Sequence, residues 1–99
     1  MYKLIGYERK QGSFTHKDSG EIVEYDNYEL FYVTDEKRSD NMKGLFCDSA
    51  RAKVADLKFS GCKNIDEALN KEVYFIVDLT AKADENGRAR LNVDRIVVL

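Results

Sequence analysis

Apolar and polar residues alternate along the first third of the chain in the way that strands require. The stretch from Tyr2 to Lys10 alternates imperfectly and is rich in strand-favouring residues, and Gly6 in its middle indicates a bend or bulge. Asp18-Ser19-Gly20 is a turn signal, and the stretch from Glu21 to Val33 predicts a second strand. The pattern therefore predicts two long strands around a small polar hinge, followed by a polar loop over residues 35–41.

The middle of the chain carries a weaker pattern. Lys43 to Asp48 predicts a short third strand, whereas Ser49 to Phe59 fits both a helical and an extended interpretation. Asn64 to Lys71 predicts a helix, because Asn64 suits the N-cap and Glu67 stands three residues later at the capping-box position.

A two-stranded hairpin is predicted for the last part of the sequence. Val73 to Leu79 predicts a fourth strand, Asn86-Gly87 is a strong hairpin-turn signal, and Arg88 to Leu99 predicts a fifth strand. Three strands, a short helix and a hairpin follow the order of an OB-fold, a five-stranded Greek-key barrel. We therefore expect an all-β, OB-fold-like barrel as a single domain over residues 1–99, with one short helix between strands three and four.

Composition sets the broad class of the protein. The chain has 99 residues, of which 43% are apolar, enough to fill one modest core. No apolar run reaches the roughly eighteen residues of a membrane span, and the first residues lack the pattern of a secretory signal. We therefore expect a cytoplasmic protein with no membrane partner, in which Cys47 and Cys62 form no disulfide framework.

The sequence shows no constellation of residues that an enzyme would need. It has no Gly-rich phosphate loop and no nucleophile elbow. His16 is the one histidine, and with two cysteines it falls short of a four-ligand zinc site. We therefore expect neither catalysis, nor a metal, nor a cofactor.

Aromatic residues are more numerous than a small barrel needs for its core, with six tyrosines and five phenylalanines. Both faces of the second strand carry rings. Alternation places Tyr28, Leu30 and Tyr32 on one face and Tyr25, Asn27, Glu29, Phe31 and Val33 on the other. One face must line the core, and the other offers rings either to nucleic-acid bases or to a protein partner.

Charge narrows the class of nucleic-acid partner. The net charge is −2 and the sequence pI is about 5.4, which disfavours a polycation that coats duplex DNA. Local cations still set the field that a ligand experiences. Lys17 lies in the polar hinge and Arg9 nearby, while Arg88 and Arg90 point outward on the fifth strand, where arginines contact phosphates or keep an edge strand soluble.

Three short segments resemble the filamentous-phage family of single-stranded-DNA-binding proteins. They are Phe14-Thr15-His16-Lys17-Asp18-Ser19-Gly20, Leu30-Phe31-Tyr32-Val33 and Val93-Asp94-Arg95-Ile96. The resemblance implies an OB-fold that binds single strands cooperatively as a homodimer, with the hinge and the start of strand two as a DNA-binding wing. It also implies that Lys17 contacts a phosphate, that Arg95 contacts DNA, and that the face of Tyr32 looks toward DNA.

We therefore expect single-stranded DNA binding with little sequence specificity, in replication or transfer of phage or mobile-element DNA. The rings expected to stack on bases are Tyr28, Tyr32 and Phe46. The cations expected to meet phosphates are Arg9, Lys17, Lys43, Arg88, Arg90 and Arg95. RNA fits the same pattern, because recognition of the 2′-hydroxyl leaves no sequence motif. The alternative is a protein-interaction module of the same fold with no nucleic-acid ligand.

Overall fold

Two long antiparallel strands dominate the fold. In the computed structural model, which describes residues 1–37, 39–78 and 92–99, β1 (Tyr2–Thr15) pairs with β2 (Ile22–Thr34) along nearly its whole length. The turn between them closes with Gly20 at a φ of 71°, a conformation that costs glycine little, and the Gly20 N–H donates to the carbonyl of His16 at 2.9 Å. The predicted hairpin is confirmed, and β1 runs five residues beyond the predicted end at Lys10 because residues 11–15 find ladder partners in β2.

The remaining elements are shorter. They are β3 (Phe46–Lys53), β4 (Lys58–Ser60), α1 (Ile65–Ala68), β5 (Glu72–Asp78) and β6 (Asn92–Val98). The third strand therefore begins later than predicted. Residues 49–59, for which the sequence allowed both a helix and a strand, adopt strand conformation at both of their ends. The first end belongs to β3, and the second belongs to the three-residue β4, which was not predicted.

Five of these strands close into a barrel. The sheet order is β3-β2-β1-β5-β6-β4, and an additional parallel pairing of Arg51 with Asn92 joins β3 to β6. β5 pairs with the start of β1 at Tyr2 and Val73, while β4 extends the barrel by pairing in parallel with β6. This is the expected all-β, OB-like barrel with one short helix.

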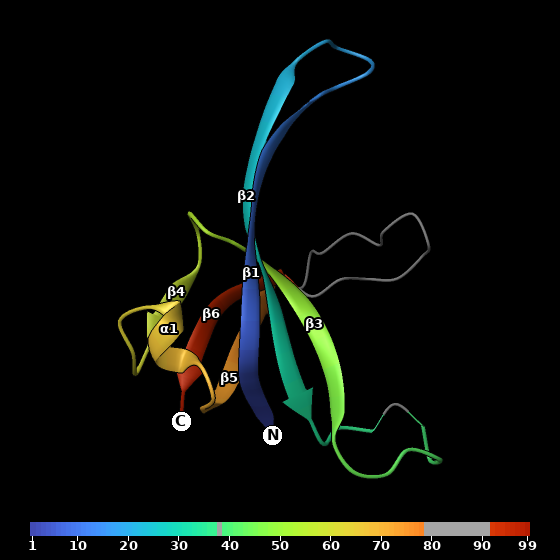
Figure 1. The fold of residues 1–99 in the computed structure, drawn as a ribbon, viewed down its shortest axis with the longest axis vertical. Coiled ribbons are helices and arrows are strands. Elements are labelled where there is room, and N and C mark those ends of the chain that lie inside the picture. Colours follow the sequence, from blue (N-terminus) through green and yellow to red (C-terminus); the bar gives the residue numbers. More distant parts are fainter. Residues whose placement is uncertain (38, 79–91) are drawn as a thin grey trace.

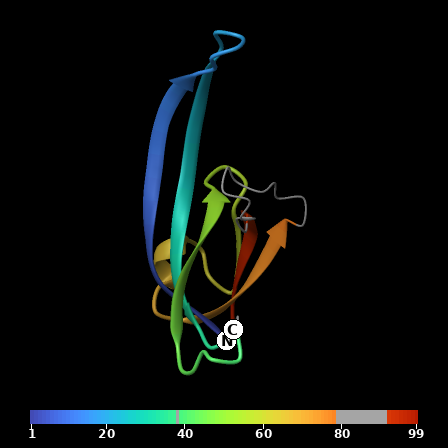
Figure 2. The ribbon, with the colours of Figure 1, turned by 90° about the vertical axis from the view of Figure 1, so that its right-hand side faces the viewer.

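The β1–β2 hairpin extends well beyond the barrel. β3 pairs with β2 only from Asn27 onward, so residues 11–15 and 22–26 pair in the ladder only with each other within the described part of the chain. Figures 1 and 2 show this two-stranded ribbon, which we call the arm, rising away from the end of the barrel where both termini lie. Its length gives the molecule a longest dimension of 46 Å.

A bulge in β1 changes which side chains of the strand point toward the core. Leu4 pairs with Tyr32 and Gly6 with Phe31, so one residue is extra at this point, as the glycine in the sequence predicted. The bulge lets Leu4 and Tyr7 both face inward although three positions separate them. The buried core comprises Leu4, Leu30, Tyr32, Ala50, Ala52, Leu57, Ile65, Ala68, Val73, Phe75, Val93 and Ile96.

Helix α1 is a single capped turn that closes one side of the barrel. The side-chain oxygen of Asn64 accepts from the Glu67 N–H at 3.1 Å, as the capping signal predicted. The helix ends at Ala68 rather than continuing to Lys71, because Asn70 takes a positive φ of 62° and donates its N–H to the Leu4 carbonyl at 2.7 Å. Within the described ranges, no helix has the length and apolar character needed to cross a membrane.

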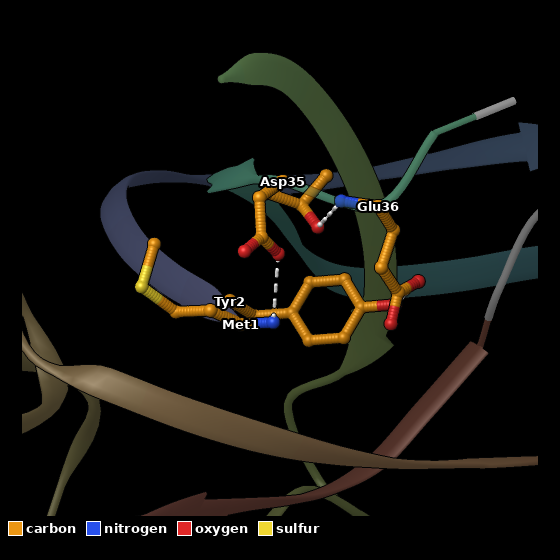
Figure 3. A network of polar contacts seen from close by, with 5 residues as sticks. Met1, Tyr2, Asp35 and Glu36 are labelled. Atoms are coloured by element: carbon orange, nitrogen blue, oxygen red, sulfur yellow. Dashed lines mark hydrogen bonds and ion pairs between the residues drawn. The ribbon is translucent and has the colours of Figure 1, made fainter. Parts of the chain in front are cut away.

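Polar contacts fasten the start of β1 to the segment that follows β2 (Figure 3). The amino group of Met1 lies 3.0 Å from Asp35 Oδ1, and the Tyr2 hydroxyl donates to Glu36. This hydrogen bond raises the pKa of Tyr2 to about 12. The Glu36 N–H donates in turn to Thr34 Oγ1 at 3.1 Å, so both ends of the segment are held.

Candidate nucleic-acid interface

The two faces of β2 are the reverse of those expected from the resemblance. Leu30 and Tyr32 are buried, at 0% and 3% exposure, whereas Tyr25 and Phe31 are 40% and 37% exposed. The expectation that Tyr28, Leu30 and Tyr32 form the exposed face is therefore wrong. The Tyr32 ring packs inside the barrel, edge-on to Tyr2 and Phe75 with centroid separations of 5.3 Å in both pairs.

The other two predicted stacking residues also lie toward the interior. Tyr28 is half-buried against the core, with its ring edge-on to that of Tyr7 at a centroid separation of 5.3 Å. Phe46 is half-buried and pairs across the ladder with Thr34, whose side chain is buried. Since paired residues share a face of the sheet, Phe46 lies on the inner side. Neither ring stands free as a stacking platform.

The register of β1, β2 and β3 arranges the solvent side of these strands, which we call the outer face, in rows. One row is Lys10–Asn27–Lys53, and the next toward the termini is Glu8–Glu29–Arg51. The row after that is Gly6–Phe31–Ser49, while Gly12–Tyr25 and Phe14–Val23 follow on the arm. Successive rows are about 7 Å apart, because a strand rises about 3.4 Å per residue.

Exposed rings lie on both sides of the Lys10–Asn27–Lys53 row. Phe31 lies two rows from it, on the side toward the termini. Tyr25 lies one row from it, on the side toward the tip of the arm. Phe14 is 52% exposed and contacts Tyr25 at a centroid separation of 6.4 Å. Gly12 makes this arrangement possible, since a Cβ there would come within 2.4 Å of the Tyr25 hydroxyl oxygen. The ring of Tyr25 therefore lies across the bare backbone of the opposite strand.

Cations outnumber acids on the outer face. The exposed or half-exposed basic residues on this face are Lys3, Lys10, Arg51 and Lys53. The exposed or half-exposed acidic residues are Glu8 and Glu29. Lys10 Nζ lies 2.5 Å from Glu29 Oε2, so part of its charge is offset locally. Arg51 is paired across the ladder with the same glutamate, and Lys53 is exposed at the end of β3. The face is thus locally positive although the whole chain is acidic.

Arg9, one of the predicted phosphate contacts, is held on the opposite side of the ribbon. Its guanidinium donates to both carboxylate oxygens of Asp26, at 2.9 Å and 2.7 Å. This pairing lowers the pKa of the Asp26 carboxyl below its ordinary value. The geometry is that of an ion pair at the base of the arm, which offsets the Arg9 charge locally, and the phosphate contact of Arg9 stays a prediction.

The other predicted cations are dispersed. Arg95 is half-buried and donates to Ser60 Oγ at 2.7 Å, which ties β6 to β4 on another side of the barrel. Lys43 is exposed in the loop before β3, and Lys17 is exposed at the tip of the arm. Arg88 and Arg90 lie outside the described residues. Among the predicted cations within the described ranges, Lys17 alone lies at the tip of the arm.

Sequence reasoning missed Lys10, Arg51, Lys53, Tyr25 and Phe31 as a group. The sequence did contain a signal for which face of β2 reaches solvent. Asn27 and Glu29 lie on the same face as Tyr25 and Phe31. On the opposite face, the one residue between Tyr28 and Tyr32 is a leucine. The more polar face of a half-buried strand is the solvent face. The contribution of β3 had no comparable signal, because its segment also fitted a helical pattern.

No group of three or more metal-ligating side chains gathers in the part of the chain that the structure describes. No protein-family model, no curated protein and no solved structure matches this chain.

Proposed function

We propose that the protein binds single-stranded DNA across the outer face of β1, β2 and β3. The observation that supports the proposal most directly is the Lys10–Asn27–Lys53 row, which has an exposed ring on either side, Tyr25 above and Phe31 below. Single-strand binders combine cations that follow the phosphate backbone with aromatic rings on which bases stack. OB-folds use the equivalent strands for this purpose.

In this proposal the rings and the cations have separate roles. Tyr25 and Phe31 stack on bases, which is tolerant of sequence because every base has a flat face. Lys10, Arg51 and Lys53 meet phosphates. The arm lengthens the path, with Phe14 and Lys17 as the outermost contacts. Recognition of this kind has little sequence specificity and accepts single-stranded RNA to some degree.

The biological setting we infer is replication or transfer of phage or mobile-element DNA. It is supported by the three short segments that resemble the filamentous-phage proteins. Tyr25 and Phe31 replace Tyr28, Tyr32 and Phe46 as the stacking rings in the proposal, while Lys17 keeps its role.

The test is fluorescence anisotropy with a labelled oligo-dT of about ten nucleotides, within the roughly 4–16 nucleotides that one OB-fold covers. Wild-type protein is expected to bind it more tightly than duplex DNA, with an affinity that falls as salt rises because counterions are released from phosphates. Phe31→Ala and Tyr25→Ala are each expected to weaken binding about tenfold, since a stacked base contributes about 1–3 kcal/mol. Leu45→Ala is the control, because Leu45 is 62% exposed in the loop before β3 and belongs to no row of the outer face.

Two results would contradict the proposal. One is unchanged affinity in a folded Phe31→Ala, Tyr25→Ala double variant. The other is an absence of binding to single strands even at low salt. The second result would favour the alternative of a protein-interaction module, for which the net charge of −2 is the specific observation.

A further inference from the structure

An acidic side chain lies in the centre of the outer face, between the two rings that are proposed to stack on bases. Tyr25, Glu29 and Phe31 lie on one face of β2, with Glu29 between the two rings along the strand. Its row, Glu8–Glu29–Arg51, places it on the middle one of the three strands. A nucleic-acid strand that stacks on both rings therefore passes over a carboxylate, which repels its phosphates.

Glu29 is bound to one of the cations of the outer face. Lys10 belongs to the neighbouring row, and its Nζ lies 2.5 Å from Glu29 Oε2 in a diagonal contact between β1 and β2. The Lys10 side chain is 50% exposed and that of Glu29 is 23% exposed. An ion pair this open to solvent contributes little to stability, because water competes for both partners and two long side chains lose freedom. The fold therefore does not depend on the contact, although the contact occupies a cation of the proposed binding face.

Glu8 provides a comparison within the same row. It pairs with Glu29 across the ladder, is exposed on the same face and carries the same charge. Within the described ranges Glu8 forms no ion pair, whereas Glu29 holds Lys10. The two acids therefore differ in whether they occupy a cation, and this difference separates the effect of the ion pair from that of a negative charge on the face.

We propose that Glu29 is an internal competitor of nucleic-acid phosphate, an autoinhibitory contact that lowers the affinity of the outer face for single strands. This inference rests on the proposed function. Lys10 must leave Glu29 before it meets a phosphate, so the apparent affinity falls to the extent that the pair is formed in the free protein. If Lys10 is released in about a tenth of the molecules, the affinity is about tenfold lower than that of the same face without the competitor. Because salt also weakens the ion pair, the competition makes binding less dependent on salt.

Fluorescence anisotropy with the labelled oligo-dT over a series of salt concentrations tests the proposal. Glu29→Gln is expected to raise the affinity about tenfold at low salt, because Lys10 is then available in nearly all molecules. The log–log dependence of affinity on salt is expected to become steeper by up to about 0.7, the increment of one phosphate contact on a single strand. Glu8→Gln is the matched control and is expected to change the affinity by less than about threefold, because Glu8 acts only through the general field of the face.

A second comparison introduces Glu29→Gln into a protein that already carries Lys10→Gln. Without the ammonium group there is no cation to release, so the gain in affinity is expected to shrink to about threefold or less. Far-UV circular dichroism on each variant confirms that the fold is kept.

Three results would overturn the proposal while leaving the proposed function in place. One is an unchanged affinity in Glu29→Gln, the second is an equal gain in Glu8→Gln, and the third is a gain that persists in full without Lys10. A failure of the wild type and of every variant to bind single strands at low salt would overturn the proposed function, and this inference with it.

Discussion

At the scale of single residues, charge has a structural use in this protein as well as a proposed functional one. Asp26 illustrates the structural use: it holds Arg9 through two hydrogen bonds and also accepts from the Gln11 side chain at 3.4 Å. The three residues belong to the two strands at the base of the arm. Their contacts therefore brace the ribbon where it leaves the barrel.

The ion pair makes stability depend on pH in a defined direction. The pKa of Asp26 is lower in the folded protein than its ordinary value, chiefly through hydrogen bonding by Arg9. Its contribution is therefore fully present above the unfolded pKa of about 3.9 and is lost as pH falls through the folded pKa. We expect Asp26→Asn to destabilise the protein at neutral pH and to differ progressively less from wild type below about pH 4.

Urea unfolding at several pH values between neutral and acid measures this difference. The control is to introduce Asp26→Asn into a protein that already carries Arg9→Gln. Without the guanidinium, most of the pH-dependent difference in stability caused by Asp26→Asn should vanish. A difference between wild type and Asp26→Asn that stays constant through acid pH would contradict the assignment.

At the scale of elements, the connection from β4 to α1 is confined by close contact with β6. Gly61 has a φ of 80°, and a Cβ built on it would lie 2.8 Å from the Val98 carbonyl oxygen. The obstacle is backbone in the closing strand of the barrel and does not move aside as a side chain would. The connection therefore tolerates only glycine at this point.

We expect Gly61→Ala to destabilise the protein by more than backbone strain alone. Gly20→Ala is the matched control, since Gly20 has a similar φ of 71° but nothing within 4 Å of the added Cβ. Both variants suffer the strain of the left-handed conformation, about 1–2 kcal/mol. Gly61→Ala should lose at least about 1 kcal/mol more, the lower end of the cost of overpacking. Denaturant unfolding measures both, and equal losses would show that the Val98 contact relaxes freely.

At the scale of the whole molecule, closure of the barrel depends on pairings between distant segments. β1 pairs with β5 through Tyr2 and Val73, and β3 pairs with β6 through Arg51 and Asn92. Such contacts form only after long loops have closed, so the barrel is expected to fold more slowly than a helical bundle of the same length. The chain contains no proline, which removes the usual source of very slow phases.

We therefore expect refolding from urea to follow a single exponential between about a millisecond and a second, the range typical of small β barrels. Stopped-flow tyrosine fluorescence measures it, since the chain has six tyrosines and no tryptophan. A dominant phase of tens of seconds, the timescale of proline isomerisation, would contradict the prediction and require another slow step.

Local pattern was enough to predict the first two strands, the helix and the strand after it, but not the three-residue β4. Alternation along β2, the capping residues Asn64 and Glu67, and the bulge beside Gly6 act over a few residues, and each appears in the structure where it was expected. The order of these elements was sufficient for the OB-like barrel, because few topologies connect them without crossings.

Packing between distant segments settled which side chains reach solvent. The resemblance favoured Tyr32 as a surface ring, but the barrel needs Tyr32 beside Tyr2 and Phe75, so Phe31 is turned outward. The Lys10–Asn27–Lys53 row exists only because three strands are aligned in one register, and residues 26 positions apart in sequence become neighbours. A one-residue slip would send each of these side chains to the opposite face, so the composition of either surface is a property of the closed barrel.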